Sequence, residues 1–256
     1  MLIGQKKTRV PEEYGFTVCA FGCVVWFTTS CREVHLTLRQ YIFPALPKTE
    51  TSAAQSDLSI RVVLDSDMLQ LWVNGVFLAY AATLMSLLPE IIRVLDDAVI
   101  QRLTGLHAVH AGAVLWGGRA ILLPGSTHAG KSSLVAELLR RGATYYSDEY
   151  ALIDPLGRAH PYPRPLLVRN GSREQFPMLP GEFGAEVGDG PVPVGLVLSL
   201  QYRPASAWSV VEIPQSLGLL SLVQNTPHLL ATSPEMMSTF QSAVAGARCY
   251  AGSRAD

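Results

Sequence analysis

Charge is scarce in this sequence. Charged residues make up 16% of its 256 residues, and the formal net charge is −1. A nearly neutral chain lacks the basic surface that binds nucleic-acid backbones, so we expect no nucleic-acid partner. Hydrophobic residues reach 48%, which is ample for a buried core. A surface with few charges also leaves apolar area for contacts between copies, so a homo-oligomer stays open.

Long apolar runs are missing as well. The longest covers residues 76–88, contains Tyr80, Thr83 and Ser86, and ends before Pro89. It is shorter than the roughly 20 residues that a membrane-spanning helix needs. Near the N-terminus no apolar segment follows the basic residues closely enough for a secretory signal. The sequence therefore predicts no membrane partner and a cytoplasmic location.

Cysteine is also rare, with Cys19, Cys23, Cys31 and Cys249 in the whole chain. The first three lie close to His35, which leaves two alternatives, a metal site or reduced thiols packed within strands. Zinc sites usually have two close pairs of ligands separated by a longer gap. This run has one loose pair and a single thiol, so its spacing favours packed thiols.

The first third of the chain is rich in β-branched and aromatic residues. The strands expected there cover residues 14–43 (two or three strands), 58–64 and 68–80. Asn74-Gly75 between two apolar runs predicts a hairpin turn. Pro89 fits the first turn of a helix whose apolar residues recur at helical spacing. We therefore expect a small β-rich domain over 1–85 and a linking helix over 86–104.

From residue 105 onward, strands and helices alternate. The expected strands are 110–116, 120–123, 143–147 continued by 150–153, 192–200 and 208–213, and the expected helices are 131–141, 215–224 and 234–245. Gly117-Gly118 predicts a tight turn between two antiparallel strands. The stretch 176–191 is rich in glycine and proline and predicts a mobile loop. Residues 105–256 thus form an α/β domain.

One motif in this domain carries chemistry. Residues 125–132 read GSTHAGKS, the G-x-x-x-x-G-K-S pattern of a phosphate-binding loop, between an apolar strand and an amphipathic helix. Gly125 and Gly130 let successive backbone N–H groups face a phosphate, and the helix N-terminus adds partial positive charge. Lys131 supplies a point charge and the Ser132 hydroxyl a ligand for Mg²⁺. The alternative is a glycine-rich turn that only caps the helix.

The candidate nucleotide-binding residues are Gly125, Ser126, Thr127, His128, Ala129, Gly130, Lys131, Ser132 and Ser133. Among them, we expect His128 to point to solvent. The candidate metal ligands are Ser132, Asp148 and Glu149.

Two acids, Asp148 and Glu149, follow the strand after this helix. An acidic residue at this place holds Mg²⁺ in P-loop enzymes, and a second one is a candidate proton acceptor. Solvated carboxylates in a turn are the alternative. His110 opens the hairpin that leads into the loop and is a candidate partner for Asp148 or a structural residue. Further along, Arg164 and Arg169 are candidates to steady a phosphate or the substrate.

Together these residues resemble a known family. The run HAGAVLWGGRAILLPGSTHAGKSS from His110, the Arg-Gly that ends at Gly142, and Ser147-Asp148-Glu149 are similar to the catalytic domain of HPr kinase/phosphorylase and its stand-alone relatives. The resemblance is specific over residues 105–155. It implies an α/β P-loop kinase domain of the HPr kinase/phosphoenolpyruvate carboxykinase type over 105–256, in which a hairpin leads into the loop.

The resemblance also implies roles for these residues. Loop residues up to Ser133 would bind the triphosphate of ATP, Ser132 would bind Mg²⁺, and His110 would support an acid pair that supplies the catalytic base and a metal contact. The family usually has Asp where this chain has Glu149, which makes Asp148 the preferred base. The family's signature for the reverse, phosphorolysis reaction is not found, so kinase activity alone is expected.

The function expected from the resemblance is transfer of the γ-phosphate of ATP to a hydroxyl of a peptide or protein, most often serine. Some stand-alone members of the family act on lasso-peptide precursors, which makes a ribosomal peptide precursor a candidate substrate. Two alternatives stay open, a kinase for a small hydroxylated metabolite and a non-catalytic ATP-binding switch. A switch would need Lys131 but neither Asp148 nor Glu149.

Overall fold

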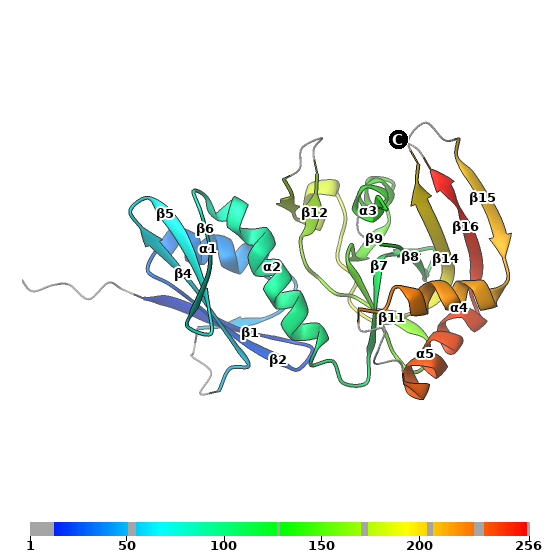
Figure 1. Cartoon of the computed structure of the whole chain (residues 1–256), viewed down its shortest axis with the longest axis horizontal. Helices are drawn as coiled ribbons and strands as arrows, with labels where there is room; N and C mark the ends of the chain where they lie inside the picture. The colour runs from blue at the N-terminus through cyan, green and yellow to red at the C-terminus, as the bar shows by residue number, and fades with distance from the viewer. Residues whose placement is uncertain are drawn as a thin grey trace, which may run out of the picture.

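The computed structural model describes residues 13–50, 55–126, 129–169, 174–203, 207–227 and 233–254. Within these ranges the chain is a mixed α/β structure with two separate main sheets, each accompanied by helices (Figure 1). No helix in them is long and apolar enough to cross a membrane. The predictions for Thr127 and His128 fall outside the described residues.

The first sheet has six strands in the described chain. In spatial order they are β3 (Lys48–Thr49), β1 (Tyr14–Ala20), β2 (Cys23–Thr29), β4 (Leu58–Asp65), β5 (Met68–Val73) and β6 (Val76–Ala81). The predicted turn between β5 and β6 is confirmed, because Asn74 and Gly75 both have positive φ angles, 49° and 78°. One face of the sheet packs against two helices and forms a single apolar core with them.

The first of these helices, α1 (Arg32–Tyr41), contradicts the prediction that 14–43 contains strands alone. Val34 and Leu38 stand four residues apart, and both are buried against the sheet. This spacing belongs to one face of a helix. The β-branched and aromatic residues around it hid the helical period, and burial outweighed their weak preference for strands.

The second helix, α2 (Leu84–Ile100), begins earlier than predicted. The Thr83 hydroxyl accepts a hydrogen bond from the Ser86 N–H at 3.2 Å and caps the helix, so Pro89 lies inside α2 and not in its first turn. Leu88, Ile91 and neighbouring apolar residues of α2 belong to the core of the first sheet. α2 is therefore part of the N-terminal unit, and it lies between that sheet and the rest of the molecule (Figure 1).

The second sheet has eight strands among the residues that the structure describes. Its main path is β11 (Arg158–His160), β10 (Tyr150–Ile153), β7 (His107–Trp116), β8 (Arg119–Pro124), β14 (Val192–Tyr202), β16 (Arg248–Arg254) and β15 (Ser209–Ile213), and β9 (Thr144–Ser147) also pairs with β7. β7 and β8 form the predicted antiparallel hairpin. β8, β14 and β16 run parallel, so their carboxyl ends meet at one edge, where ligands bind in open α/β sheets.

Helices cover this sheet on both faces. The flanking elements are α3 (Lys131–Arg140), α4 (Gln215–Gln224), α5 (Pro234–Ala245), a small hairpin of β12 (Leu166–Val168) and β13 (Phe176–Met178), and a 3₁₀ turn (Pro180–Phe183). Side chains of α4 and α5 share one core with β7, β8 and β14, whereas α3 and the 3₁₀ turn share another with β7 and β9. The positions predicted for α3, α4 and α5 are confirmed, and α3 ends one residue early.

Two features of this unit differ from the prediction. The stretch 176–191 was predicted as a mobile loop, but it contains β13 and the 3₁₀ turn, and Phe183 is buried beneath the Arg140 guanidinium. Strand β16 was not predicted. It pairs with β14 and β15, and Cys249, which it contains, is buried in the core.

Candidate functional site

The loop that follows β8 turns into α3 at a glycine. Gly130, the N-cap of α3, has φ 79° and ψ 20°, a left-handed conformation that glycine adopts without strain. A Cβ atom at this position would collide with the guanidinium of Arg254, whose Nη2 donates to the Gly130 carbonyl oxygen at 3.1 Å. The backbone conformation and the close contact with Arg254 therefore both require a glycine at position 130. Arg254, at the end of the unpredicted β16, is a cation beside the loop that sequence reasoning missed.

The Lys131 side chain is hydrogen-bonded to the backbone of the loop. Its Nζ donates to the carbonyl oxygens of Gly125 at 2.8 Å and Ser126 at 3.1 Å, and lies 3.4 Å from His110 Nε2. Burial lowers the pKa of Lys131, and the negative charge of nearby Glu149 opposes that shift. The loop thus holds a buried cation where the motif places the phosphate-binding lysine.

His110 forms a hydrogen bond with Glu149 beside this lysine, with 2.5 Å between Nε2 and Oε1, so its partner is Glu149 and not Asp148 as predicted. The pairing is built into the sheet, because His110 of β7 stands opposite Tyr150, the residue after Glu149. Burial alone would raise the pKa of Glu149. The hydrogen bond with His110 and the charges of Arg164 and Lys131 outweigh that effect and lower the pKa to about 2. Glu149 is therefore ionised at neutral pH.

Asp148, the neighbouring acid, has a different environment. Its side chain is 0% exposed, and four protein groups donate to its two oxygens. Arg164 Nη1 at 3.0 Å and the Tyr145 hydroxyl at 3.2 Å bind Oδ1, whereas the Ser132 hydroxyl and the Leu167 N–H, both at 3.1 Å, bind Oδ2. Complete burial raises the pKa of this carboxyl group, and the charge of Arg164 acts against the increase. Asp148 is thus held in place and closed to solvent.

The two adjacent acids therefore offer different chemistry. Glu149 keeps 31% of its side-chain surface exposed and lies with His110 and Lys131 at the mouth of the loop. Asp148 is buried and accepts a hydrogen bond from the Ser132 hydroxyl. A group that exchanges a proton with a substrate needs access to it, which Glu149 has and Asp148 lacks in this conformation.

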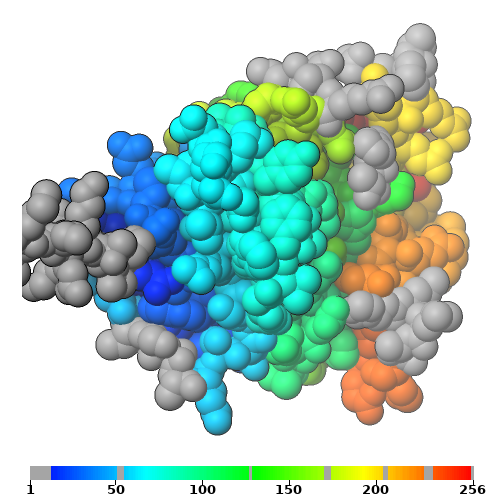
Figure 2. All heavy atoms as spheres, turned by 60° about the vertical axis from the view of Figure 1, so that its left-hand side comes forward, coloured from blue at the N-terminus to red at the C-terminus, as the bar shows by residue number. Residues whose placement is uncertain are grey.

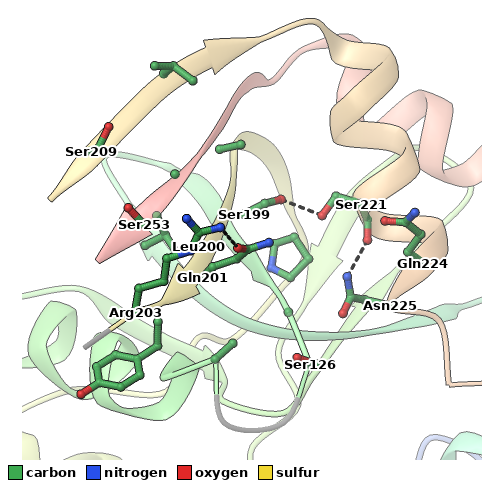
Figure 3. Close-up of a pocket in the computed structure, with 17 residues that line it drawn as sticks. Ser126, Ser199, Leu200, Gln201, Arg203, Ser209, Ser221, Gln224, Asn225 and Ser253 are labelled. Atoms are coloured by element: carbon green, nitrogen blue, oxygen red, sulfur yellow. Dashed lines mark hydrogen bonds between the residues drawn. The ribbon is translucent and has the colours of Figure 1, made fainter. Parts of the chain in front are cut away.

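Two sizeable cavities adjoin the described part of the loop. The larger, with a volume of about 940 Å³, lies at the carboxyl ends of the parallel strands and includes Gly125, Ser126 and Ala129 in its wall (Figure 3). Hydroxyl and amide groups dominate the rest of the wall, and Ser199 and Ser221 share a hydrogen bond of 2.6 Å there. None of its described lining residues is acidic. We call it the hydroxyl-lined cavity, and its size suits a drug-sized ligand.

The smaller cavity, about 400 Å³, lies on the His110 side of the loop. Its wall includes His110, Ser126 and Tyr150 of the second unit, together with Asp97 and Ile100 of α2. We call it the α2 cavity. Because Ser126 lines both cavities, the loop stands between them.

The structure brings together five of the residues predicted for the site: His110, Lys131, Ser132, Asp148 and Glu149. Ser133 is exposed on α3 and takes no part in this cluster. Sequence reasoning also missed buried partners of the site, chiefly Asp96 and Tyr145. Asp96 left one signal, because an acid on the apolar face of a helix is out of pattern.

Two further candidates from the sequence remain, Arg164 and the cysteines of the N-terminal unit. Arg164 is 2% exposed and bound to carboxylates, so it holds an acid and not a phosphate or substrate. Cys19 is exposed whereas Cys23 is buried, and within the described residues no three His, Cys, Asp or Glu side chains form a group that could hold a metal ion.

No protein-family model matches the chain, and no curated protein is significantly similar to it.

Proposed function

We propose that the protein is an ATP-dependent phosphotransferase with an HPr kinase-type P-loop, which moves the γ-phosphate to a hydroxyl of a peptide or protein. The observation that carries the proposal is the arrangement around the loop. Lys131 lies beside the His110–Glu149 pair on one side, and Ser132 donates to Asp148 on the other. Such a loop between an antiparallel hairpin and a helix is the arrangement expected from the family resemblance.

Triphosphate binding follows from the loop's donors. On ATP binding, Lys131 exchanges the carbonyl oxygens of Gly125 and Ser126 for phosphate oxygens, since an ammonium group binds anionic oxygen more strongly. The N-terminus of α3 adds backbone N–H groups and partial positive charge. The hydroxyl-lined cavity next to the loop, with no acidic residue in its described wall, receives the nucleoside.

The donor set also fits Mg²⁺. This ion prefers oxygen ligands and is usually held by one or two carboxylates together with substrate phosphates and water. The Ser132 hydroxyl and Asp148 Oδ2, 3.1 Å apart, are oxygen groups of this kind next to the phosphate path. When bound, Mg²⁺ neutralises charge on the phosphates. Ser132 would bind it, and Asp148 would act through the Ser132 hydroxyl, because its own oxygens are enclosed by protein donors.

Glu149 is the proton acceptor in this proposal. It is ionised, partly exposed and oriented by His110, and it lies near the α2 cavity, from which the acceptor hydroxyl approaches. Its low pKa makes it a weak base. In the loose transition state of phosphoryl transfer, the position of the acceptor hydroxyl counts for more than covalent help from the protein.

The test is incubation with ATP and Mg²⁺ and a set of peptides that contain serine, followed by intact-mass spectrometry. Any short precursor encoded beside the gene is included in the set. A gain of one phosphate group that is lost in Lys131→Ala and in Glu149→Gln supports the proposal. An ATP-binding protein that modifies no peptide contradicts the peptide-kinase assignment.

One observation favours a second candidate, a kinase for a small hydroxylated metabolite. The α2 cavity holds about 400 Å³, which is near the lower end of the range for small-molecule sites and accepts one side chain or one small molecule. ATP turnover stimulated by a polyol or sugar, with no peptide modified, would identify this alternative. ATP binding that survives Glu149→Gln and is never followed by turnover would identify a nucleotide-binding switch.

A further inference from the structure

A buried ion network joins the N-terminal unit to the proposed site. Asp96 of α2 is 4% exposed and Arg164 of the second unit is 2% exposed. Asp96 Oδ2 lies 3.4 Å from Arg164 Nε, and Arg164 Nη1 lies 3.0 Å from Asp148 Oδ1. One guanidinium group therefore bridges a carboxylate of each unit.

Two side chains of one short segment reach Asp96. Tyr162 donates its hydroxyl to Asp96 Oδ1 at 2.8 Å, and Arg164 pairs with the other oxygen. The Arg164 N–H donates to the Tyr162 carbonyl oxygen at 2.9 Å, so a tight turn centred on Pro163 holds these two residues close together. The segment is thus shaped to present a hydroxyl and a guanidinium to the same carboxylate.

Burial of the Asp96 carboxylate costs free energy, and packing alone does not explain why an acid occupies this position. Burying a carboxylate is unfavourable unless it is paired and hydrogen-bonded. The other buried residues of α2, such as Leu88, Ile91 and Leu95, are apolar. An apolar residue in place of Asp96 would serve that core equally well, so the acid serves Arg164.

Arg164 also binds Asp148, so the conformation of its side chain affects that carboxylate. A guanidinium on a long side chain has many conformations, and a second carboxylate restricts them to the one that meets Oδ1. With Oδ1 held by Arg164 and Tyr145, Oδ2 faces the Ser132 hydroxyl. We infer that Asp96 is a positioning residue of the phosphotransfer site, which orients Asp148 through Arg164 and so makes the N-terminal unit part of that site. This inference rests on the proposed function.

The experiment measures kcat, KM for ATP and the Mg²⁺ concentration for half-maximal activity in full-length Asp96→Asn. The asparagine oxygen still accepts the Tyr162 hydroxyl, whereas the oxygen opposite Arg164 becomes an amide NH2, so the negative charge and the acceptor at that position are both lost. We expect kcat to fall about 10- to 100-fold, the range found when a group that orients a metal ligand is removed. KM for ATP stays within about twofold, because the loop is untouched, and more Mg²⁺ is needed.

Two controls separate positioning from general damage. Asp154→Asn removes a buried acid that is paired with Arg158 and His160, away from the loop. Glu90→Gln removes an exposed acid of α2 that is paired with Arg93. Both variants keep kcat within about twofold of the original protein, since surface or remote changes seldom reach the chemistry.

A double-mutant cycle tests the route through Arg164. If Asp96 acts through this residue, Asp96→Asn lowers kcat in the original protein but adds nothing in an Arg164→Gln background. Full additivity would overturn the inference, as would an equal loss of kcat in Asp154→Asn. If Lys131→Ala abolishes turnover while Asp96→Asn leaves kcat unchanged, the inference fails and the proposed function stands. An original protein without ATP turnover contradicts both.

Discussion

The two sheets of this molecule differ in where they bury charge. In the described chain, the unit built on the second sheet buries Lys131, Asp148, Asp154 and Arg164. Within the described residues, the first sheet and its helices bury one carboxylate, Asp96, which pairs with Arg164 of the second unit, and one histidine, His35. An apolar core needs volume and pattern alone, whereas a buried charge needs a partner. The comparison shows that most of the buried charge lies in the unit that contains the proposed site.

The largest effect is expected at Arg164, whose ion pairs join the two units. Arg164→Gln leaves Asp96 and Asp148 buried without their common cation, which should lower the free energy of unfolding by about 3–5 kcal/mol. Urea unfolding followed by circular dichroism measures this change. The matched control is Arg61→Gln on the exposed surface of the first sheet, which should change stability by less than about 0.5 kcal/mol. Equal effects would remove the distinction between the sheets.

The two units can also be compared through one lysine in each, Lys48 and Lys131. Lys48 of the first unit donates to the carbonyl oxygens of Phe43 and Leu46, as Lys131 does to two carbonyls of the loop. We expect Lys131→Ala to lower ATP turnover about 100- to 1,000-fold, the loss that follows removal of a group that stabilises transition-state charge. Lys48→Ala should cost about 1 kcal/mol of stability and leave turnover unchanged. Initial rates of ADP release distinguish the two.

The adjacent acids allow a sharper test within the second unit. Glu149→Gln should lower kcat about 100-fold with ATP affinity retained, at the low end for a proton acceptor because base strength counts little in a loose transition state. Asp148→Asn should instead raise the Mg²⁺ concentration needed for activity, since this acid faces Ser132. Titrations of rate against Mg²⁺ separate the two. A pure kcat effect in Asp148→Asn would move the proton acceptor to that residue.

The smallest effect is expected at the far edge of the first sheet. Strand β6 has no partner on its outer side in the described chain, and its Leu78 and Tyr80 are 48% and 69% exposed. Figure 2 shows the face that the β5–β6 hairpin (cyan) presents to solvent. Leu78→Lys should change the free energy of unfolding by less than about 0.5 kcal/mol and leave turnover intact. Leu71→Lys in the adjacent strand, at a fully buried position, should prevent folding.

Much of the second unit was predictable because its signals are local. The glycine pair between β7 and β8 marks a turn, apolar spacing marks α3, α4 and α5, and the GSTHAGKS pattern marks the loop, all within a few residues. Helix α1 and the segment 176–191 were mispredicted because their residues are individually ambiguous. Burial against elements distant in the sequence decided their structure.

The sequence by itself determined the α/β class, the strand–loop–helix unit around Lys131 and the proximity of His110, Lys131 and the two acids. The loop and the proximity of His110 and Lys131 follow from chain neighbours and from one hairpin, whereas Glu149 meets His110 through the pairing of β10 with β7. Only the tertiary structure decided that Asp148 is enclosed and Glu149 accessible, and that Asp96 and Arg164 meet although 68 residues separate them in the sequence. The physical reason is that burial and ion pairing depend on which distant elements pack together. No local pattern of residue types records that.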